Sequence, residues 1–239
     1  RLYLDCGSHP EMSSPECSDP WQLARYAAAG DRILAGLADE LLRGDETLRE
    51  VFVSRCNVDY AGTGSTWGSH ESYLHRATPV VLHTALLPHL VSRIVFSGAG
   101  GFDNTARESL RFLLSPRVPH LLREVSDCSV GMRGVLHTKD EPLCEGGYHR
   151  LHLLCGESLC SELGTVLRFG TTALIVALVE AGAAPGRAVQ LEAPLRALHD
   201  FAADPTCRAS AWCLGGRQRR AVDIQRHYLR EVEQRLGEP

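Results

Sequence analysis

Strand-like and helix-like segments follow one another along this chain without the regular strand–helix–strand rhythm that builds a parallel sheet. Such a mixture predicts the α+β class, with a mostly antiparallel sheet packed by helices. Gly, Pro and capping side chains mark the ends of the segments. The expected strands cover residues 1–5, 51–55, 69–76, 149–155 and 208–214; the expected helices cover 20–44, 108–125, 161–180, 194–203 and 221–236, and another begins at 78.

Length and composition exclude several classes of protein. The chain has 239 residues, enough for one large domain with its own core, and a formal net charge of −4. General nucleic-acid binders usually carry a basic surplus, so no nucleic-acid partner is expected. The longest apolar run, residues 173–179, is far too short to span a bilayer, so no membrane partner is expected.

The nine cysteines follow neither a zinc pattern nor a disulfide framework. Reduced thiols in the cytoplasm are the simpler interpretation. The sequence opens without Met, in what reads as the middle of a strand. We therefore expect it to be a central part of a longer protein.

The first segment with chemical potential is rich in carboxylates. Asp5, Glu11 and Glu16 lie within twelve residues, beside Gly and Pro residues that fix an irregular backbone. Hard oxygen ligands of this kind suit Mg²⁺, which in turn bridges nucleotide phosphates. If spacing alone is considered, solvent-exposed charges in a surface loop are an equally good explanation.

Alternation in residues 1–5 divides the opening strand into two faces. Arg1, Tyr3 and Asp5 share one face, where Arg1 could pair with a phosphate. Leu2 and Leu4 share the other face, which we expect to contact the core.

Two later segments carry candidate anion ligands. Residues 62–68 form a Gly/Ser/Thr-rich turn, typical of phosphate-binding backbone, and lead into a strand with His70 and Glu71. Alternation places these two side chains on opposite faces. Arg150 and His152 share a strand face and could reach one anion. His70 and Arg150 are therefore candidate cofactor ligands, although a plain hairpin turn and a solvated strand edge are the simpler interpretations.

Taken in order, these segments resemble the family of Pup ligases and depupylases, which is related in fold to glutamine synthetase. The resemblance spans nearly the whole chain and implies a glutamine-synthetase-like fold with a curved sheet. It covers residues 1–239 as the central part of a catalytic domain, without the family's N-terminal metal-binding strand and small C-terminal domain. It rests on Arg1-Leu2-Tyr3-Leu4-Asp5, His9-Pro10-Glu11, Asn57-Val58-Asp59, His70-Glu71, Gly98-Ala99-Gly100, Asp140-Glu141-Pro142, Arg150-Leu151-His152, Gly170-Thr171 and Asp223-Ile224-Gln225-Arg226 with Tyr228.

The resemblance implies specific roles for residues of the opening segment. Asp5 matches the family's catalytic aspartate, a base or nucleophile. Tyr3 and Glu11 match magnesium ligands. Arg1 and Ser14 match ATP contacts, Ser14 replacing a threonine.

The implied activity is ATP-dependent isopeptide ligation. The side chain of the C-terminal Glu of a Pup-like protein modifier would be joined to substrate lysines through an acyl phosphate, marking proteins for proteasomal degradation. Lysine-bearing proteins would be the second partner. Two alternatives stay open: a depupylase that hydrolyses the same bond, towards which residues 170–174 lean, and a pseudoenzyme, motivated by departures from the family at Met12, Ser72 and Glu157.

Overall fold

The computed structural model describes residues 1–5, 7–106, 110–127, 131–138 and 144–236. The chain forms two compact units. The first comprises Arg1–Arg55 and Cys160–Gly170, and the second comprises Cys56–Leu159 and Thr171–Pro239. The family segment at residues 140–142 and the thiol of Cys6 lie outside the described residues.

The first unit begins with a short hairpin. Strands β1 (Leu2–Leu4) and β2 (Pro10–Met12) pair antiparallel, with Tyr3 directly opposite Glu11. Leu2 and Leu4 are 45% and 67% exposed, so the expectation that they contact the core is wrong. Leu2 shares its hairpin face with Met12, which meets the following helix at Gly30, and that helix covers this face only in part.

Helix α1 (Pro20–Gly44) follows the hairpin and agrees with the sequence prediction. The Asp19 side chain caps it by accepting a hydrogen bond from the backbone N–H of Gln22 at 2.8 Å, and Pro20 occupies its first turn. Met12 of the hairpin packs against the helix at Gly30, where a side chain would collide with the thioether.

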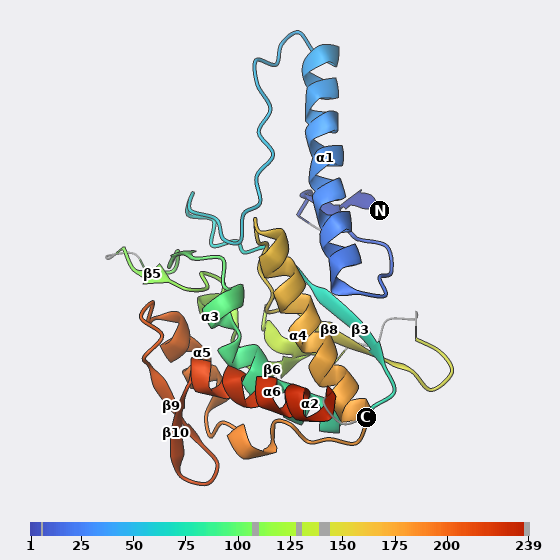
Figure 1. Cartoon of the computed structure of the whole chain (residues 1–239). Helices are drawn as coiled ribbons and strands as arrows, with labels where there is room; N and C mark the ends of the chain where they lie inside the picture. Colours follow the sequence, from blue (N-terminus) through green and yellow to red (C-terminus); the bar gives the residue numbers. More distant parts are fainter. Residues whose placement is uncertain (6, 107–109, 128–130, 139–143, 237–239) are drawn as a thin grey trace. The chain divides into compact units, whose positions relative to one another are not determined.

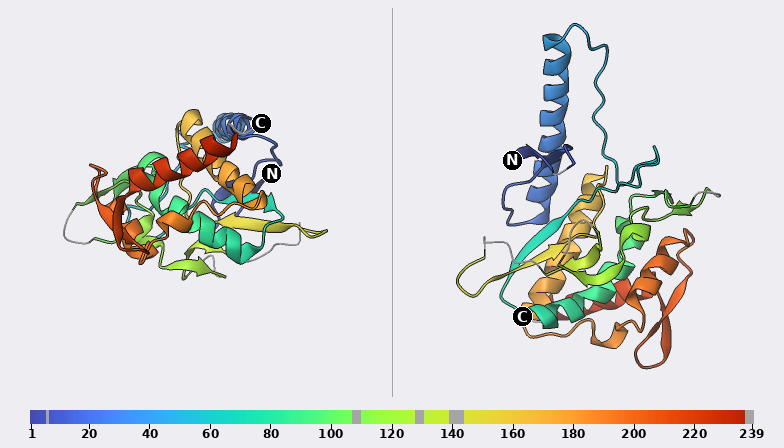
Figure 2. Two further views of the ribbon diagram at one scale, coloured as in Figure 1. Left: turned by 60° about the horizontal axis from the view of Figure 1, so that its bottom comes forward. Right: turned by 180° about the vertical axis from the view of Figure 1, so that it is seen from behind.

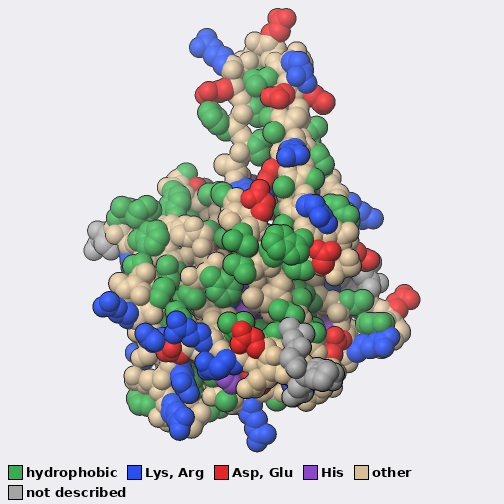
Figure 3. Space-filling view, viewed as in Figure 1, with side chains coloured by type: hydrophobic (Ala, Val, Ile, Leu, Met, Phe, Trp, Pro, Cys, Tyr) green, Lys and Arg blue, Asp and Glu red, His purple; other side chains and the backbone are tan. Residues whose placement is uncertain are grey.

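Most residues of α1 (Figure 1) are exposed or half-buried, and hydrophobic side chains intermingle with charged ones over its surface (Figure 3). The largest exposed apolar residues are Trp21, Ile33, Leu37 and Leu41.

A four-stranded sheet forms the centre of the second unit. Its order is β3 (Glu71–His75), β8 (His149–Leu153), β7 (Gly134–His137) and β6 (Arg123–Ser126). All pairs are antiparallel except β6 with β7. The predicted α+β class is confirmed.

Helices pack against this sheet to enclose the core (Figures 1 and 2). Helix α2 (Pro79–Ser92) is apolar on nearly all sides and contacts β7, α5 (Pro194–Ala202) and α6 (Ala221–Leu236). The fully buried side chains of the core include Leu82, Leu86, Leu90, Val91, Leu121, Val135, Leu136, Leu151, Leu153, Ile175, Leu198 and Ile224.

Helix α4 (Glu162–Glu180) is long and apolar enough to cross a membrane by composition alone. Its Ile175, Val176 and Val179 belong to the core of the second unit, whereas Leu163, Leu167 and Leu174 are exposed.

Short elements complete the second unit. They are α3 (Ile94–Ser97), β4 (Gly101–Phe102), β5 (Phe112–Leu113), the 3-10 turns Val118–His120 and Arg187–Val189, and the hairpin β9 (Ser210–Cys213) with β10 (Arg217–Arg220).

Two predicted elements are wrong. No strand forms at residues 51–55, which run as irregular backbone. In place of the helix predicted over 108–125, the described part holds β5, a 3-10 turn and β6. Pro116 and Pro119 lack the N–H group that a helix interior requires. They therefore prevent an α-helix in the described part of this segment.

The Gly98 turn yields a test of the packing. Gly98 has an ordinary φ of −75°, but a Cβ there would lie 2.2 Å from the carbonyl oxygen of Leu114 and 2.8 Å from that of Ile94. Backbone oxygens cannot move aside, so Gly98→Ala should lower the free energy of unfolding by about 1–3 kcal/mol in urea denaturation.

The matched control is Gly36→Ala in α1, where an added Cβ meets nothing within 4 Å. That variant should gain up to about 1 kcal/mol, because Ala restricts the unfolded helix segment. Equal stability of the two variants would contradict the packing described at Gly98.

Candidate functional site

The hairpin of the first unit brings three predicted site residues onto one face. Tyr3 donates its hydroxyl hydrogen to Glu11 Oε1 at 2.8 Å, as their opposed register allows. Burial, followed by the hydrogen bond and charge of Glu11, raises the pKa of Tyr3 to about 12. The phenol therefore stays protonated, and its oxygen lies beside a carboxylate.

Asp5 occupies the end of the same hairpin face as an ionised carboxylate. Its Oδ1 accepts hydrogen bonds from the backbone N–H groups of Gly7 and His9, each at 2.8 Å, and lies 3.0 Å from His9 Nδ1. These contacts, led by the backbone N–H of His9, lower the pKa of the carboxyl group. Ser8, with φ of 62°, makes the tight turn that aims both N–H groups at Asp5.

The donor atoms of this face suit a hard cation. Among the described residues no cluster of three or more His, Cys, Asp or Glu side chains is arranged to hold a metal. Tyr3 and Glu11 nevertheless place two oxygen atoms side by side. Mg²⁺ commonly takes one or two protein oxygens and completes its shell with waters and phosphates, so the pair fits a partial magnesium site.

The two predicted ATP contacts of the first unit are exposed. Arg1 shares the strand face of Tyr3 and Asp5 by alternation. Ser14 follows β2 and is exposed. Both side chains are open to a ligand.

The second unit carries the other two predicted ligands on the opposite face of the sheet from the helices. The Arg150 guanidinium donates to Ser72 Oγ through Nε at 3.0 Å and Nη2 at 2.9 Å. The rings of His70 and His137 flank His152, with centroid distances of 5.5 Å and 5.1 Å. Arg150 and His152 thus share a face, as alternation predicts.

The electrostatic environment of this face is positive. Burial of its ring lowers the pKa of His70 to about 4, and the charges of Arg117, His137, Arg133 and Arg150 act in the same direction. Protein atoms crowd the ring, although the residue as a whole is exposed. His70 is therefore a neutral imidazole in a cationic surrounding, which favours an incoming anion.

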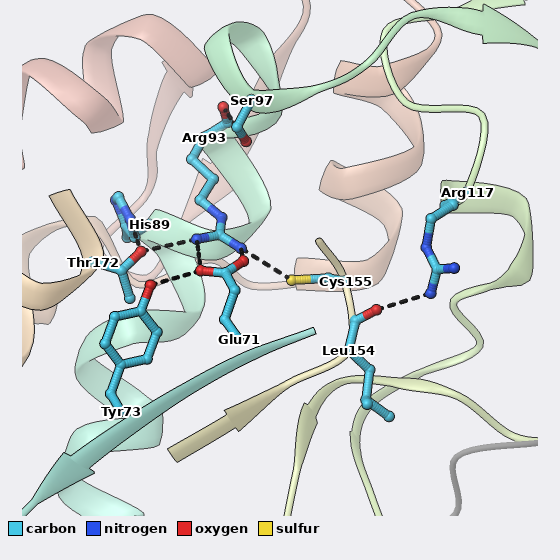
Figure 4. Close-up of polar contacts among 9 residues, drawn as sticks. All are labelled: Glu71, Tyr73, His89, Arg93, Ser97, Arg117, Leu154, Cys155 and Thr172. Carbon is cyan, nitrogen blue, oxygen red and sulfur yellow. Dashed lines mark hydrogen bonds and ion pairs between the residues drawn. The ribbon is translucent and has the colours of Figure 1, made fainter. Parts of the chain in front are cut away.

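Glu71, the next residue along the chain, points to the helix side of the sheet. Its carboxylate forms an ion pair with Arg93, with Oε1 2.5 Å from Nη2 and Oε2 3.0 Å from Nη1, and both residues are at most 2% exposed (Figure 4). Burial alone would lower the pKa of Arg93, but the charge of Glu71 raises it. His70 and Glu71 accordingly serve different sites.

The ion pair belongs to a wider buried network (Figure 4). Thr172 of α4 accepts from Arg93 Nη1 at 2.8 Å and lies 3.2 Å from His89 Nε2. Tyr73 donates to Glu71 Oε2 at 2.7 Å. His89 in turn lies 3.1 Å from Gln225 Oε1 on α6, so one network ties together β3, α2, α4 and α6.

A second buried arginine was not anticipated from the sequence. Arg117 is 1% exposed and donates through Nη2 to the carbonyl oxygen of Leu154 at 2.9 Å. Its backbone N–H donates to Glu157 Oε1 at 3.0 Å, and Glu157 also accepts from Ser115 Oγ and the N–H of Ala99. Burial dominates and raises the pKa of Glu157. In the sequence, Glu157 is marked only by its departure from the family pattern.

The comparisons with known proteins agree with this fold. The family model described as "Pup-ligase protein" matches residues 1–238, so the chain belongs to the Pup-ligase family. Proteins named Pup--protein ligase from Kineococcus radiotolerans and Mycolicibacterium smegmatis are each 38% identical over 240 residues, covering 98% of this chain and 52% of the relative. The chain thus spans about half the length of these relatives.

Two solved structures resemble the whole chain. A structure of the Pup ligase PafA in complex with ADP matches with a TM-score of 0.85 and 28% identity, covering 100% of this chain and 52% of the other. The complex between the prokaryotic ubiquitin-like protein Pup and PafA matches with a TM-score of 0.84 and 29% identity, covering 48% of the other chain.

The Glu157 contacts yield a second test. Glu157→Gln should lower the free energy of unfolding by about 1–3 kcal/mol, because an amide nitrogen would then face a buried N–H group. The folded pKa of Glu157 lies above the unfolded value, so its stability contribution is full at low pH and is lost as pH rises through the folded pKa. The variant lacks this dependence.

The stability difference between wild type and Glu157→Gln should therefore widen from neutral towards acid pH in urea denaturation. Glu46→Gln, at an exposed position, is the control and should change little. A difference that narrows at acid pH would overturn the sign assigned to Glu157.

Proposed function

We propose that this chain is the central part of an ATP-dependent ligase that joins the side chain of a C-terminal Glu of a Pup-like modifier to lysines of protein substrates. The observation that carries the proposal is the single hairpin face shared by Tyr3, Asp5 and Glu11, within a chain matched to the family along its length. The named relatives are ligases, and this favours ligation over the hydrolase and pseudoenzyme alternatives.

Ligation of a carboxylate needs activation, because the oxide ion is a poor leaving group. ATP supplies it by transferring a phosphoryl group to the modifier's carboxylate, which gives an acyl phosphate. The lysine amine then attacks the acyl carbon and phosphate leaves. The ADP complex of a structural neighbour supports nucleotide use by this family.

Asp5 is the base of this reaction in our proposal. Its pKa is lowered, so it is fully ionised and remains an acceptor at neutral pH. The His9 and Gly7 contacts occupy Oδ1, while Oδ2 has His9 Nδ1 as its one described hydrogen-bond contact, at 3.1 Å. Oδ2 is therefore the atom that would receive the proton of the lysine ammonium group.

Tyr3 and Glu11 would hold Mg²⁺, which when bound neutralises charge on the phosphate oxygens. The hydrogen bond between Tyr3 and Glu11 fixes both oxygens on one side of the hairpin before any ligand arrives. Arg1 and Ser14 would contact the nucleotide from the same segment, Arg1 by pairing with a phosphate.

Within the second unit, His70 and Arg150 are the proposed nucleotide contacts. Their surroundings are positive, which suits a polyphosphate. Arg150 is aligned by its two hydrogen bonds to Ser72, so the family departure at Ser72 keeps a useful acceptor.

The partners follow from the proposed reaction. A Pup-like protein supplies the carboxylate, as in the complex of the structural neighbour with Pup, and lysine-bearing proteins supply the amine. The seven cysteines that the structure describes carry free thiols, which suits the reducing cytoplasm.

The test compares Asp5→Asn with wild type. Asn keeps an Oδ1 that accepts from Gly7 and His9, so the hairpin should persist while the base is lost. We expect ATP-dependent joining of a Pup-like modifier to a lysine-bearing protein, followed by gel shift, to slow by about 10²–10⁴-fold with ADP binding retained.

Asp204→Asn is the matched control, because Asp204 also caps a turn, accepting from the N–H groups of Thr206, Arg208 and Ala209. It should retain activity. If Asp5→Asn ligates at the wild-type rate, Asp5 is not the base. If the wild-type protein binds no ADP, the proposed function is wrong.

A further inference from the structure

The turn before β3 is clamped by a guanidinium group. Arg117 Nη1 donates to Thr66 Oγ1 at 3.2 Å, and Nη2 donates to the carbonyl oxygen of Leu154, just beyond β8, at 2.9 Å. A single side chain thus joins the Gly-rich turn to the end of the central strand.

Gly68 shows how closely the two groups fit. A Cβ at Gly68 would lie 2.8 Å from Arg117 Nη2, 2.9 Å from Cζ and 3.0 Å from Nη1. The guanidinium therefore lies flat against the backbone of the turn, and any side chain at residue 68 would displace it.

The Arg117 contacts also fix the position of His70. The N–H of Ser69 donates to the carbonyl oxygen of Gly156 at 3.1 Å, so the chain is fixed on both sides of the Gly68 contact. Glu157, the next residue after Gly156, holds the Arg117 backbone. Two residues beyond Gly68, the His70 ring meets His152 at a centroid distance of 5.5 Å.

The charge of Arg117 is incompletely compensated. Among the residues that the structure describes, no carboxylate lies within ion-pair distance of its guanidinium, and its buried Nε–H finds no acceptor. Burial, opposed by the charge of Glu157, lowers its pKa to about 10. After burial, the charges of Arg117, His137, Arg133 and Arg150 lower the pKa of His70, while the carboxylate of the adjacent Glu71 points to the other face of the sheet.

We propose that Arg117 is a positioning residue: it sets the His70 ring and the surrounding positive field so that a phosphoryl anion binds between His70 and Arg150. The inference rests on the proposed function, whose nucleotide would supply that anion. It adds a residue that contacts no ligand and acts through the turn that it holds.

Nucleotide binding tests the proposal without the ligation reaction. Arg117→Met removes both its hydrogen bonds to the turn and its charge, and the Kd for ADP with Mg²⁺ should rise about 10–100-fold in calorimetry, as when a group that orients ligand-binding residues is lost. Gly68→Ala keeps the charge but displaces the guanidinium, and it should weaken ADP binding in the same direction while the protein stays folded.

The His70 ring gives a readout that a purely structural role would not move. In wild type its proton NMR signal, assigned by its loss in His70→Gln, should stay constant between about pH 5.5 and pH 8, as expected of a neutral ring. Without the Arg117 charge the signal should begin to titrate in that range. Inorganic phosphate should raise the apparent pKa of His70 in wild type more than in Arg117→Met.

Val118→Ala is the matched control, since Val118 is the buried neighbour of Arg117 and its truncation destabilises the same segment. It should lower stability and leave both the ADP affinity and the His70 signal unchanged. If Val118→Ala weakens ADP binding as much as Gly68→Ala does, or if Gly68→Ala binds ADP like wild type, the positioning role is refuted. The proposed function fails only if the wild-type protein binds no ADP, whereas the positioning role fails if Gly68→Ala binds ADP like wild type. The two failures are therefore distinguishable.

Discussion

The buried ion pair between Glu71 and Arg93 is the interaction on which the second unit depends. Two buried charges are stable only when they are paired with each other and hydrogen-bonded. Removing one partner leaves the other charge buried and unpaired. Here Glu71 opens β3 and Arg93 ends α2, so the pair fixes the sheet against its helices. Thr172 extends the network to α4, and Gln225, through His89, extends it to α6.

This network also determines what the other sheet face can do. With Glu71 committed to the helix side, alternation leaves Ser72 on the open side, where it receives Arg150. Arg117 holds the turn that precedes the strand, so both ends of the His70–Glu71 step are anchored by buried guanidinium groups. Arg93 stabilises the core, and Arg117 positions residues of the proposed anion site.

The sequence predicted the parts whose causes are local. Asp19, Pro20 and Gly44 mark the ends of α1, and the boundaries of α6 agree with the prediction. Alternation correctly placed Tyr3 and Asp5 on one hairpin face, although the hydrogen bond from Tyr3 to Glu11 depends on a pairing register that the turn at Ser8 sets.

What the sequence could not predict depends on contacts between distant residues. Nothing in the local sequence marks Arg93 as the buried partner of Glu71, because that role depends on residues that only the fold brings together. Glu71, Gln225 and Tyr228 belong to the family motifs that the sequence showed, yet all three are part of the buried interior or its polar network. Motif order therefore identified the family, while the structure separates residues that build the fold from those that stay candidates for ligand binding.

A double-mutant cycle on Glu71 and Arg93 tests this account most directly. Urea denaturation of Glu71→Gln, Arg93→Met and the double variant gives the coupling free energy of the pair. Each single change should cost about 3–5 kcal/mol, and the double variant should cost clearly less than their sum, because no charge is then stranded. Single variants within about 1 kcal/mol of wild type, or strictly additive losses, would show that the ion pair does not hold the sheet to its helices.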